Sequence, residues 1–453
     1  MHFGWPSPSL PQLLDKNSTI PITSEEGSWI AVMPLLGNLC GSILGALILD
    51  LIGRKTVILL SCIPYLIAWI VIAYTRSVAI IISARFLAGI SDGLTFCALP
   101  MYFGEIADSK VRGALGSSVV VTWIFGTLLI NIIGSYLTIK TTALVSSVVP
   151  VLGLLTFVWM PESPYYLIMK GNSEQARKNL QTLKCTDNVG LDLERISKAI
   201  KEQYENTGRY LDLFTVKSNR KALGIALLLR AAQQLSGTSA ITFYAQIIFQ
   251  EAGNSSKISA SEASIIYFTV QFVLCVCCST IVDRAGRRPL LIVSIVGAGF
   301  ALFAEGSYFY ALNKFGMNLD NFTWIPLTAL VCYVISFSLG MLTIPAMMLG
   351  EIFPINVKAF ALGLIDIYFS IIVTIVSKCF QITKDSFGLH VSFYGFFMVC
   401  VIGLVFIMLF VPETKGKTLE EIQDELRGYS VKDSSEDNIK LSEKLKMIPE
   451  LNS

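Results

Sequence analysis

Two sets of polar residues in this sequence have types and spacings that suit a chemical role. The first is QQLSGTSAITFYA at residues 233–245, inside an otherwise apolar run. On a continuous helix, Gln233, Gly237 and Tyr244 share one face, with Gln234 beside them. A face of amides, hydroxyls and a phenol without net charge can bind the hydroxyl groups of a neutral solute. The alternative is that these side chains hydrogen-bond neighbouring helices, as Gln and Ser do in membranes.

The second set consists of acidic and basic residues that recur in the same order in two blocks of the chain. In each block an Asp precedes an Arg by four residues, a Glu precedes a basic residue by seven, and a Pro-Glu pair follows. Half-buried charges at neighbouring helix ends can form a latch that is stronger than an exposed ion pair and still opens. The alternative is that they only set the topology. The predicted network comprises Asp50, Arg54, Lys55, Glu105, Arg112, Glu162, Asp283, Arg284, Arg287, Arg288, Glu351, Lys358 and Glu413.

The elements that position these residues are predicted from eleven apolar stretches, each of a length that spans a bilayer. Hydrophobic residues make up 53% of the chain and charged residues 15%, against about 25% in soluble domains. Apolar and polar residues do not alternate one by one along these stretches, which argues against a membrane β-barrel. The sequence therefore predicts an all-α polytopic membrane protein with spans at 29–49, 57–75, 78–103, 114–138, 141–160, 223–250, 263–282, 289–312, 323–350, 358–382 and 391–411.

Lys and Arg divide unequally between the segments that connect these spans. One set of segments, which includes the C-terminal tail, carries 26 of them, and the other set carries six. Because positive charge is retained in the cytosol, the first set is predicted to be cytosolic. Glycosylation sequons at Asn17, Asn254 and Asn321 all fall on the charge-poor side, where glycosylation occurs. These signals predict a multi-pass plasma membrane protein with a cytosolic C-terminus.

The repeated order of charges indicates an internal duplication, which is typical of secondary transporters. The second block has six predicted spans and the first has five, so the first helix of the N-terminal half is predicted to be largely missing. Residues 1–14 would then form its outer end and the loop after it. The predicted organisation is an N-terminal bundle, a cytosolic loop with short helices, a six-helix C-terminal bundle and a cytosolic tail, at 1–160, 161–222, 223–411 and 412–453.

Cysteines and glycines in the spans are interpreted as packing residues. Nine of the ten cysteines fall in apolar spans, where they behave as small buried side chains. Neither a metal site nor a cofactor is expected. Gly37, Gly41 and Gly45 recur every four residues, and this spacing predicts a close contact between two helices.

Charged residues within membrane spans are functional candidates by default. Arg85 is predicted to join the cytosolic charge network. Asp92 and Asp366 are interpreted either as proton carriers or as partners of a nearby basic residue. The full set is Arg85, Asp92, Arg230, Glu305, Asp366 and Lys378.

Taken together, these motifs resemble the sugar porter family of the major facilitator superfamily. The likeness is carried by GRK after Asp50, RFLAGI from Arg85, GEIADSKVRG, PESP, QQLSG, VDRAGRRPL, GEIFP and PETKGKTLEEI. FGWPSPSLPQL and VSKCFQ resemble more particularly the insect facilitated trehalose transporter-like branch. The resemblance implies the major facilitator fold, in which two six-helix bundles surround a central sugar site and work by alternating access.

The resemblance also implies a sugar site built mainly from the C-terminal half. The family's paired glutamines correspond to Gln233 and Gln234, and its polar position on the eighth helix corresponds to Gln271. Ser239 stands where the family usually has Asn, and Ala346 stands where a tryptophan is expected to stack on the sugar. An Asn-Trp pair of the eleventh helix is replaced by Asp366-Ile367. The predicted substrate-binding residues are Gln233, Gln234, Ser239, Tyr244, Gln271 and Asp366.

The predicted function is transport of a neutral sugar, such as a hexose or trehalose, by facilitated diffusion, and not an enzymatic reaction. The alternatives are a proton-coupled sugar symporter and a non-transporting sugar sensor. Acidification on adding sugar would indicate the symporter, and the absence of saturable flux would indicate the sensor. The expected partners are a small neutral sugar and the lipid bilayer, with no nucleic acid. The protein is expected to be a monomer.

Overall fold

The computed structural model describes residues 1–107, 111–205, 211–253, 258–315, 322–415, 417, 421, 422 and 425, and these residues are mostly α-helical. The N-terminal half contains α1 (Pro6–Leu14), α2 (Ser24–Ile52), α3 (Arg54–Tyr74), α4 (Val78–Ile106), α5 (Arg112–Tyr136) and α6 (Ile139–Phe157). Four shorter helices follow, which are α7 (Pro164–Met169), α8 (Ser173–Lys184), α9 (Gly190–Glu205) and α10 (Asp212–Thr215).

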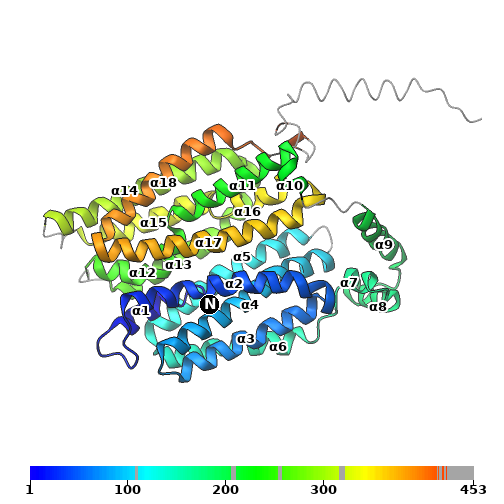
Figure 1. Ribbon diagram of the computed structural model, residues 1–453, viewed down its shortest axis with the longest axis horizontal. Helices are drawn as coiled ribbons and strands as arrows, with labels where there is room; N and C mark the ends of the chain where they lie inside the picture. Colours follow the sequence, from blue (N-terminus) through cyan, green and yellow to red (C-terminus); the bar gives the residue numbers. More distant parts are fainter. Residues whose placement is uncertain are drawn as a thin grey trace, which may run out of the picture.

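The C-terminal half contains α11 (Lys217–Leu235), α12 (Thr238–Glu251), α13 (Ala260–Ala285), α14 (Arg287–Phe315), α15 (Trp324–Leu339), α16 (Ile344–Ile352), α17 (Ile355–Phe387) and α18 (Leu389–Phe410). Figure 1 shows the two halves side by side, with α7, α8 and α9 projecting beyond one end of the bundle. We call this the charged end, where α2 and α4 finish and α17 begins. We call the other end, where α2 and α4 begin, the opposite end.

The duplication predicted from the charges recurs in the way equivalent helices begin and end. Thr23 and Glu26 form a capping box at the start of α2, and Ser259 and Glu262 form the same box at the start of α13. Each of these helices ends at a glycine in which φ is positive, Gly53 (97°) and Gly286 (93°). Only glycine adopts such a φ without strain, so the sharp reversals into α3 and α14 depend on it.

Ten helices among the described residues are long and apolar enough to cross a membrane, judged by length and composition. The sequence predicted eleven spans, and the difference lies at residues 223–250. This stretch divides into α11 and α12 at Ser236–Gly237, where Gly237 has a φ of 88°. A Cβ on Gly237 would lie 2.3 Å from the ring of Phe396, so both the backbone and the packing require glycine there.

The glycine spacing in α2 produces a close contact with α4. A Cβ on Gly37 would lie 2.1 Å from the carbonyl oxygen of Phe86, and one on Gly41 would lie 2.2 Å from that of Ile90. Gly89 of α4 faces the carbonyl of Pro34 at 2.0 Å by the same measure. Hydrogen replaces a side chain at these positions, so the two backbones approach closely, as predicted.

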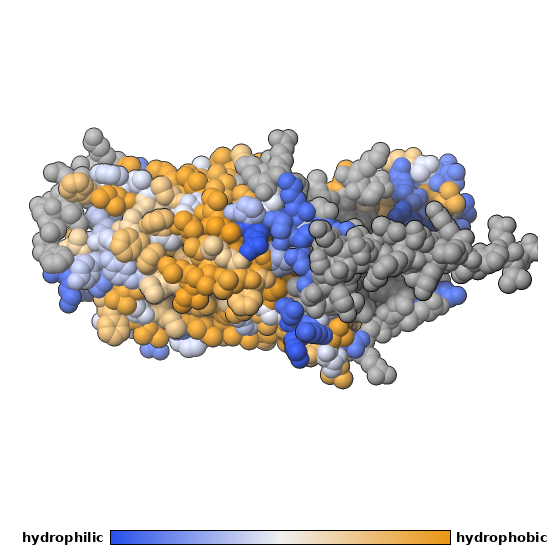
Figure 2. Space-filling view, turned by 90° about the horizontal axis from the view of Figure 1, so that it is seen from above, coloured by the Kyte–Doolittle hydropathy of each residue, from blue (hydrophilic) through white to orange (hydrophobic). Residues whose placement is uncertain are grey.

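The outer surface of the bundle is apolar. Figure 2 shows hydrophobic residues over the middle of one face, with hydrophilic residues gathered toward its two ends. Many large hydrophobic side chains are exposed, including Leu47 (65%), Leu155 (62%), Phe300 (71%) and Ile402 (65%). Exposure on this scale is costly in water and favourable in hydrocarbon, so the surface fits a lipid bilayer.

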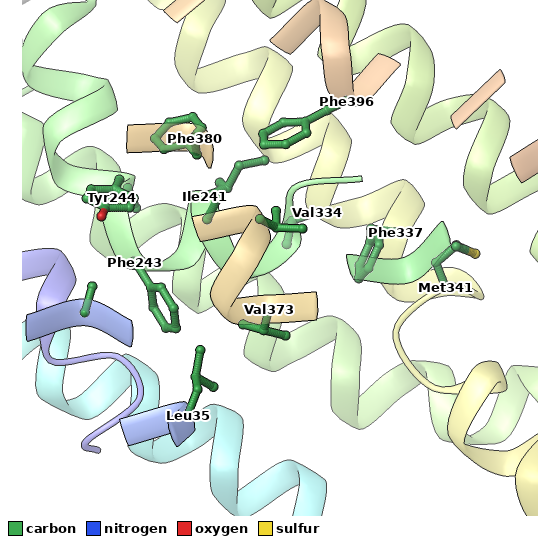
Figure 3. Packing of buried hydrophobic residues seen from close by; sticks show 14 of the residues in the cluster. Leu35, Ile241, Phe243, Tyr244, Val334, Phe337, Met341, Val373, Phe380 and Phe396 are labelled. Atoms are coloured by element: carbon green, nitrogen blue, oxygen red, sulfur yellow. The ribbon is translucent and has the colours of Figure 1, made fainter. Parts of the chain in front are cut away.

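The two halves meet along a seam formed by three pairs of helices. These pairs are α2 with α17, α5 with α13 and α1 with α12. Aromatic rings pack across the seam, with ring centroids 4.7 Å apart for Phe3 and Phe243 and 5.4 Å apart for Phe125 and Phe272. Figure 3 shows Phe243 near Leu35 of α2 and Val373 of α17, where elements of both halves converge.

Candidate functional site

Gln233 lies near the C-terminal end of α11 and is only 3% exposed. Its Nε2 donates hydrogen bonds to the carbonyl oxygens of Met341 (2.6 Å) and Leu342 (3.1 Å), which lie between α15 and α16. Its Oε1 accepts a hydrogen bond from Nη1 of Arg230 at 2.9 Å. These contacts tie α11 to the segment between α15 and α16, and they engage the whole amide of Gln233 within the C-terminal half.

Gln234 and Ser239 bind each other across the break between α11 and α12. Oγ of Ser239 donates to Oε1 of Gln234 at 2.7 Å, and both residues are 4% exposed. The hydroxyl of Tyr333 donates to the carbonyl oxygen of Ser236 at 3.3 Å. A helix break leaves backbone groups without partners, and the Tyr333 hydroxyl supplies one of the missing contacts.

The continuous helical face predicted for residues 233–245 is wrong. The left-handed backbone of Gly237 interrupts the helix, so the register of α11 does not continue into α12. Tyr244 is 1% exposed, and its ring centroid lies 5.3 Å from that of Phe380 (Figure 3). Its hydroxyl has no hydrogen-bond partner. In this conformation Tyr244 therefore packs in an aromatic core.

Asp366 of α17 lies at the seam between the halves. It is partly buried, and one turn later Oγ of Ser370 accepts a hydrogen bond from Nδ2 of Asn38 in α2 at 3.0 Å. Asp366 also interacts electrostatically with Arg230 of α11. Arg230 thus connects two predicted binding residues, Gln233 and Asp366. The sequence marked Arg230 only as a charge within a span, although its spacing of three residues from Gln233 places the two on one helix face.

Gln271 of α13 is 7% exposed. Its helix packs both against α12 and against α5 of the other half. Ala346 lies in α16, directly after the segment whose carbonyls bind Gln233. The six predicted binding residues therefore come from α11, α12, α13 and α17, all in the C-terminal half.

At the charged end of the N-terminal half, Arg54 is the centre of the predicted network. Its Nη1 lies 3.0 Å from Oδ1 of Asp50, and its Nε lies 3.1 Å from Oε1 of Glu105. The other oxygen of Glu105 accepts a hydrogen bond from Oγ of Ser163. Arg54 itself is only 3% exposed. These contacts join α2, α3 and α4 to the segment that leads into α7.

The C-terminal half repeats this arrangement with equivalent residues. Nη2 of Arg287 lies 3.1 Å from Oε1 of Glu351, and the other oxygen of Glu351 accepts a hydrogen bond from Oγ1 of Thr414. Arg287, Glu351 and Thr414 thus correspond to Arg54, Glu105 and Ser163. The duplication read from the sequence therefore extends to matched hydrogen bonds.

The two Pro-Glu motifs use their carboxylates as helix caps. Glu162 accepts from the backbone N–H of Lys55 at 3.1 Å, at the start of α3. Glu413 accepts from the backbone N–H groups of Arg287 and Arg288, both at 3.0 Å, at the start of α14. A carboxylate at a helix N-terminus satisfies free amides and complements the helix dipole. These two acids therefore bind backbone amides of Lys55, Arg287 and Arg288, which belong to the predicted network.

The environment of Glu413 also lowers the pKa of its carboxyl group. Burial by itself raises the pKa of Glu413, but the backbone N–H groups of Lys415, Arg287 and Arg288 outweigh this effect. The net result is a pKa below the usual value, because each of these hydrogen bonds stabilises the charged form.

Other members of the predicted network have different contacts or lie outside the described residues. Nζ of Lys358 donates to the carbonyl oxygen of Gly350 at 2.7 Å, and Nζ of Lys55 donates to that of Val158 at 2.7 Å. The side chains of Arg112, Asp283 and Arg284 lie outside the part of the structure that is described. The predicted latch between the halves therefore stays a prediction, since each contact given above at the charged end lies within one half.

Arg85 does not lie at the charged end, so the prediction that it joins the charge network there is wrong. It lies two turns into α4 from the opposite end, fully buried. Its Nε donates to the carbonyl of Ile30 at 3.1 Å and its Nη1 to that of His2 at 2.7 Å. Its guanidinium also lies 5.2 Å from the ring of Trp5. Because α4 runs from the opposite end to the charged end, Arg85 and the network are at opposite ends of the same helix.

Two other charged residues within spans have contrasting surroundings. Asp92 of α4 accepts a hydrogen bond from the hydroxyl of Tyr65 in α3. Glu305 of α14 is fully buried, and neither of its carboxylate oxygens has a hydrogen-bond partner. The hydrogen-bond partner of Asp92 is therefore a phenol, and not the basic residue that one of the two sequence interpretations required.

The remaining predictions concern the surface and the cysteines. Asn17 is exposed in the loop between α1 and α2, and Asn254 and Asn321 lie outside the described residues. Seven of the described cysteines have free thiols, namely Cys40, Cys62, Cys97, Cys185, Cys332, Cys379 and Cys400. No cluster of three or more metal-ligating side chains occurs among the described residues.

Two equivalent halves of membrane-length helices, joined at a seam with buried polar groups, define a helical membrane protein of the major facilitator fold. The chain belongs to the sugar transporter family, because residues 11–426 match the family described as "Sugar (and other) transporter". The match begins within α1 and ends beyond Glu413.

Curated relatives support the same family. The chain is 36% identical over 442 residues to the facilitated trehalose transporters Tret1 of Aedes aegypti and Culex quinquefasciatus. Both alignments cover 96% of this chain. They cover 54% of the Aedes aegypti relative and 84% of the Culex quinquefasciatus relative. Trehalose transporter 1 of Drosophila melanogaster is 34% identical, with 51% of its length covered. The chain thus spans about half the length of several of these relatives.

Solved structures show the same fold. The inward-open xylose transporter XylE of E. coli superimposes with a TM-score of 0.76 at 22% identity, covering 93% of this chain and 96% of that one. XylE bound to 6-bromo-6-deoxy-D-glucose gives a TM-score of 0.72 at 24% identity, covering 94% and 96%. The predicted major facilitator fold is therefore confirmed.

Proposed function

We propose that this protein carries a neutral sugar across a membrane by facilitated diffusion. The observation that carries the proposal is the likeness to facilitated trehalose transporters over 96% of the chain. The seam supports it, because it places Asn38, Ser370 and Asp366 inside an apolar bundle. Buried polar groups are costly in a membrane and are retained where a polar solute passes.

The contacts between the halves support an alternating-access cycle. Polar contacts cross the seam at its centre, between Asn38 and Ser370, and toward the opposite end, between Ser28 and Lys378. The charged-end contacts of Arg54 and Arg287 each lie within one half. In the proposed cycle, the two halves separate at the opposite end. The charged network of each half then binds that of the other and closes the charged end.

The proposed solute is trehalose or another neutral sugar of similar size. Its hydroxyl groups would exchange with the internal hydrogen bonds that now engage Gln233, Gln234 and Ser239. Gln271 and Asp366 would complete the site, and Tyr244 would have to leave its aromatic neighbours to join it. Ala346 supports a disaccharide over a single hexose, since a small side chain leaves more room than a tryptophan.

The proposed location is the plasma membrane, with the charged end and the C-terminus in the cytosol. The excess of Lys and Arg in the charged-end segments supports this orientation. The proposed bundles comprise residues 1–160 and 223–411, and we propose that one copy of the chain is the transporting unit, with Asn17 on the outside open to glycosylation.

Transport in purified proteoliposomes tests the function directly. The full chain is reconstituted, and uptake of labelled trehalose and glucose is followed over time with empty liposomes as control. We expect saturable, gradient-driven uptake that is unaffected by collapsing a pH gradient. Failure to move any of a panel of neutral sugars would contradict the proposed function, and dependence on the pH gradient would replace uniport with symport.

A further inference from the structure

The amide of Gln233 has no free capacity for a sugar in the present conformation. Both of its N–H groups are directed at backbone carbonyls, those of Met341 and Leu342. Its oxygen faces Nη1 of Arg230 at 2.9 Å. Because a guanidinium only donates hydrogen bonds, it fixes which way the amide points. Arg230 therefore fixes the orientation in which Gln233 binds the segment between α15 and α16.

Arg230 retains hydrogen-bonding capacity of its own. Its Nε is buried and has no hydrogen-bond partner. Its Cζ lies 5.4 Å from the centroid of the Phe369 ring on α17, which orients the planar group against that helix. A buried donor without a partner is uncommon in proteins, and this N–H group is free to donate to a ligand.

Asp366 provides the matching acceptor from the neighbouring helix. It lies one turn before Phe369, against whose ring Arg230 packs, and one turn before Ser370, which accepts a hydrogen bond from Asn38 of the other half. The charged groups of Arg230 and Asp366 attract each other but do not form a direct salt bridge. A donor and an acceptor separated in this way can be bridged by a group that both accepts and donates.

We propose that Arg230 and Asp366 form a subsite that binds adjacent hydroxyl groups of the transported sugar. The carboxylate of Asp366 accepts one O–H, and Nε of Arg230 donates to the oxygen of the next hydroxyl. Hydrogen bonds to charged groups are stronger than those between neutral groups, and the opposite charges leave the subsite without net charge. The subsite therefore selects neutral polyols over ions. This inference rests on the proposed function.

Two conservative variants test the subsite in the reconstituted full chain. Arg230→Gln keeps a donor for Gln233 but removes the charge and Nε, and Asp366→Asn removes the charge with little change of shape. We expect each to raise KM for trehalose uptake about tenfold, with Vmax less affected, since one charge-assisted hydrogen bond is lost. Arg76→Gln, at an exposed residue between α3 and α4, is the matched control and should leave KM unchanged.

A set of trehalose analogues that each lack one hydroxyl group separates binding from positioning. One analogue should bind weakly to the original protein. The Arg230→Gln variant should bind this analogue no more weakly, because the substitution and the missing hydroxyl group remove the same hydrogen bond. The subsite would be overturned if, for every analogue, the effects of the substitution and of the missing hydroxyl group on KM multiplied. Variants with the same KM as the original protein would also overturn it. A fall in Vmax without any change in KM would assign Arg230 to holding Gln233 alone and would also overturn it. If the original protein moves no sugar at all, the proposed function fails instead.

Discussion

At the scale of single residues, the two halves use a carboxylate to begin an internal helix. Glu162 and Glu413 each follow a proline and each accept backbone N–H groups at the start of α3 and α14. Their neighbours Glu105 and Glu351 pair with Arg54 and Arg287. Acids that look alike in the sequence thus have two separate roles, since one pair caps helices and the other neutralises buried arginines.

Glu413→Gln tests the capping role through its pH dependence. The pKa of Glu413 is below its usual value of 4.5, so its carboxylate stabilises the fold above that pH. This contribution is lost as the pH falls through the folded-state pKa. We expect the variant to lose about 1 kcal/mol of stability at neutral pH, as for loss of a helix cap. Thermal unfolding in detergent should show the difference shrinking below pH 4.5.

The control for this measurement is Glu174→Gln. Glu174 is fully exposed and pairs with Lys178 within α8, so its loss should change little at any pH. A stability difference for Glu413→Gln that persists unchanged in acid would mean that its carboxylate charge is not what caps α14.

At the scale of helices, close packing depends on glycines whose hydrogens face a backbone. Gly37 and Gly41 of α2 and Gly89 of α4 leave less room than a methyl group needs. The break at Gly237 has the same dependence, combined with a positive φ. The rigid pairing of α2 and α4 and the bend between α11 and α12 therefore follow from single positions.

Gly41→Ala tests the α2–α4 contact with the smallest possible change. Its Cβ would lie 2.2 Å from the carbonyl oxygen of Ile90, so the helices must separate, at about 1–3 kcal/mol of overpacking cost. We expect a lower unfolding temperature and reduced uptake. Gly395→Ala on α18 has open space around it and should be neutral or stabilising. Equal behaviour of the two variants would show that the contact is not tight.

At the scale of the whole molecule, the polar closure between the halves is richest toward the opposite end. Nζ of Lys378 lies 3.6 Å from the ring centroid of Trp29 and donates to Oγ of Ser28 at 2.6 Å. One turn later, Nε2 of Gln381 donates to Oγ of Ser24. These contacts join α17 to the first turns of α2 and hold this end of the seam together.

Lys378→Gln should loosen this closure. Loss of the cation–π contact, about 1 kcal/mol, shifts the balance between closed and open forms about fivefold. Spin labels on Glu25→Cys and Ser386→Cys, in a chain whose native cysteines are replaced, would report the separation of α2 and α17. We expect a larger long-distance population in the variant. Trp159→Ala, at a residue 87% exposed, is the control, and an unchanged distance distribution for Lys378→Gln would argue against the closure.

The sequence by itself determined the class of fold, the duplication and the partners of Arg54 and Arg287. Apolar length and charge bias act locally along the chain, so the spans other than residues 223–250 could be placed without knowing their neighbours. The Asp50–Arg54 pair lies one helical turn apart, so its geometry is also local. The glycine spacing in α2 likewise predicted a contact, although not that α4 would be the partner.

Only the tertiary structure decided which polar groups meet. A left-handed glycine at 237 interrupts the helix and ends the face that periodicity predicted. Arg85 lies toward the opposite end because α4 begins there. Glu413 caps α14, which begins 126 residues earlier in the chain. Hydrogen bonds between distant segments depend on how helices rotate and pack against one another. That rotation is set by the whole core and is not encoded in any one stretch of sequence.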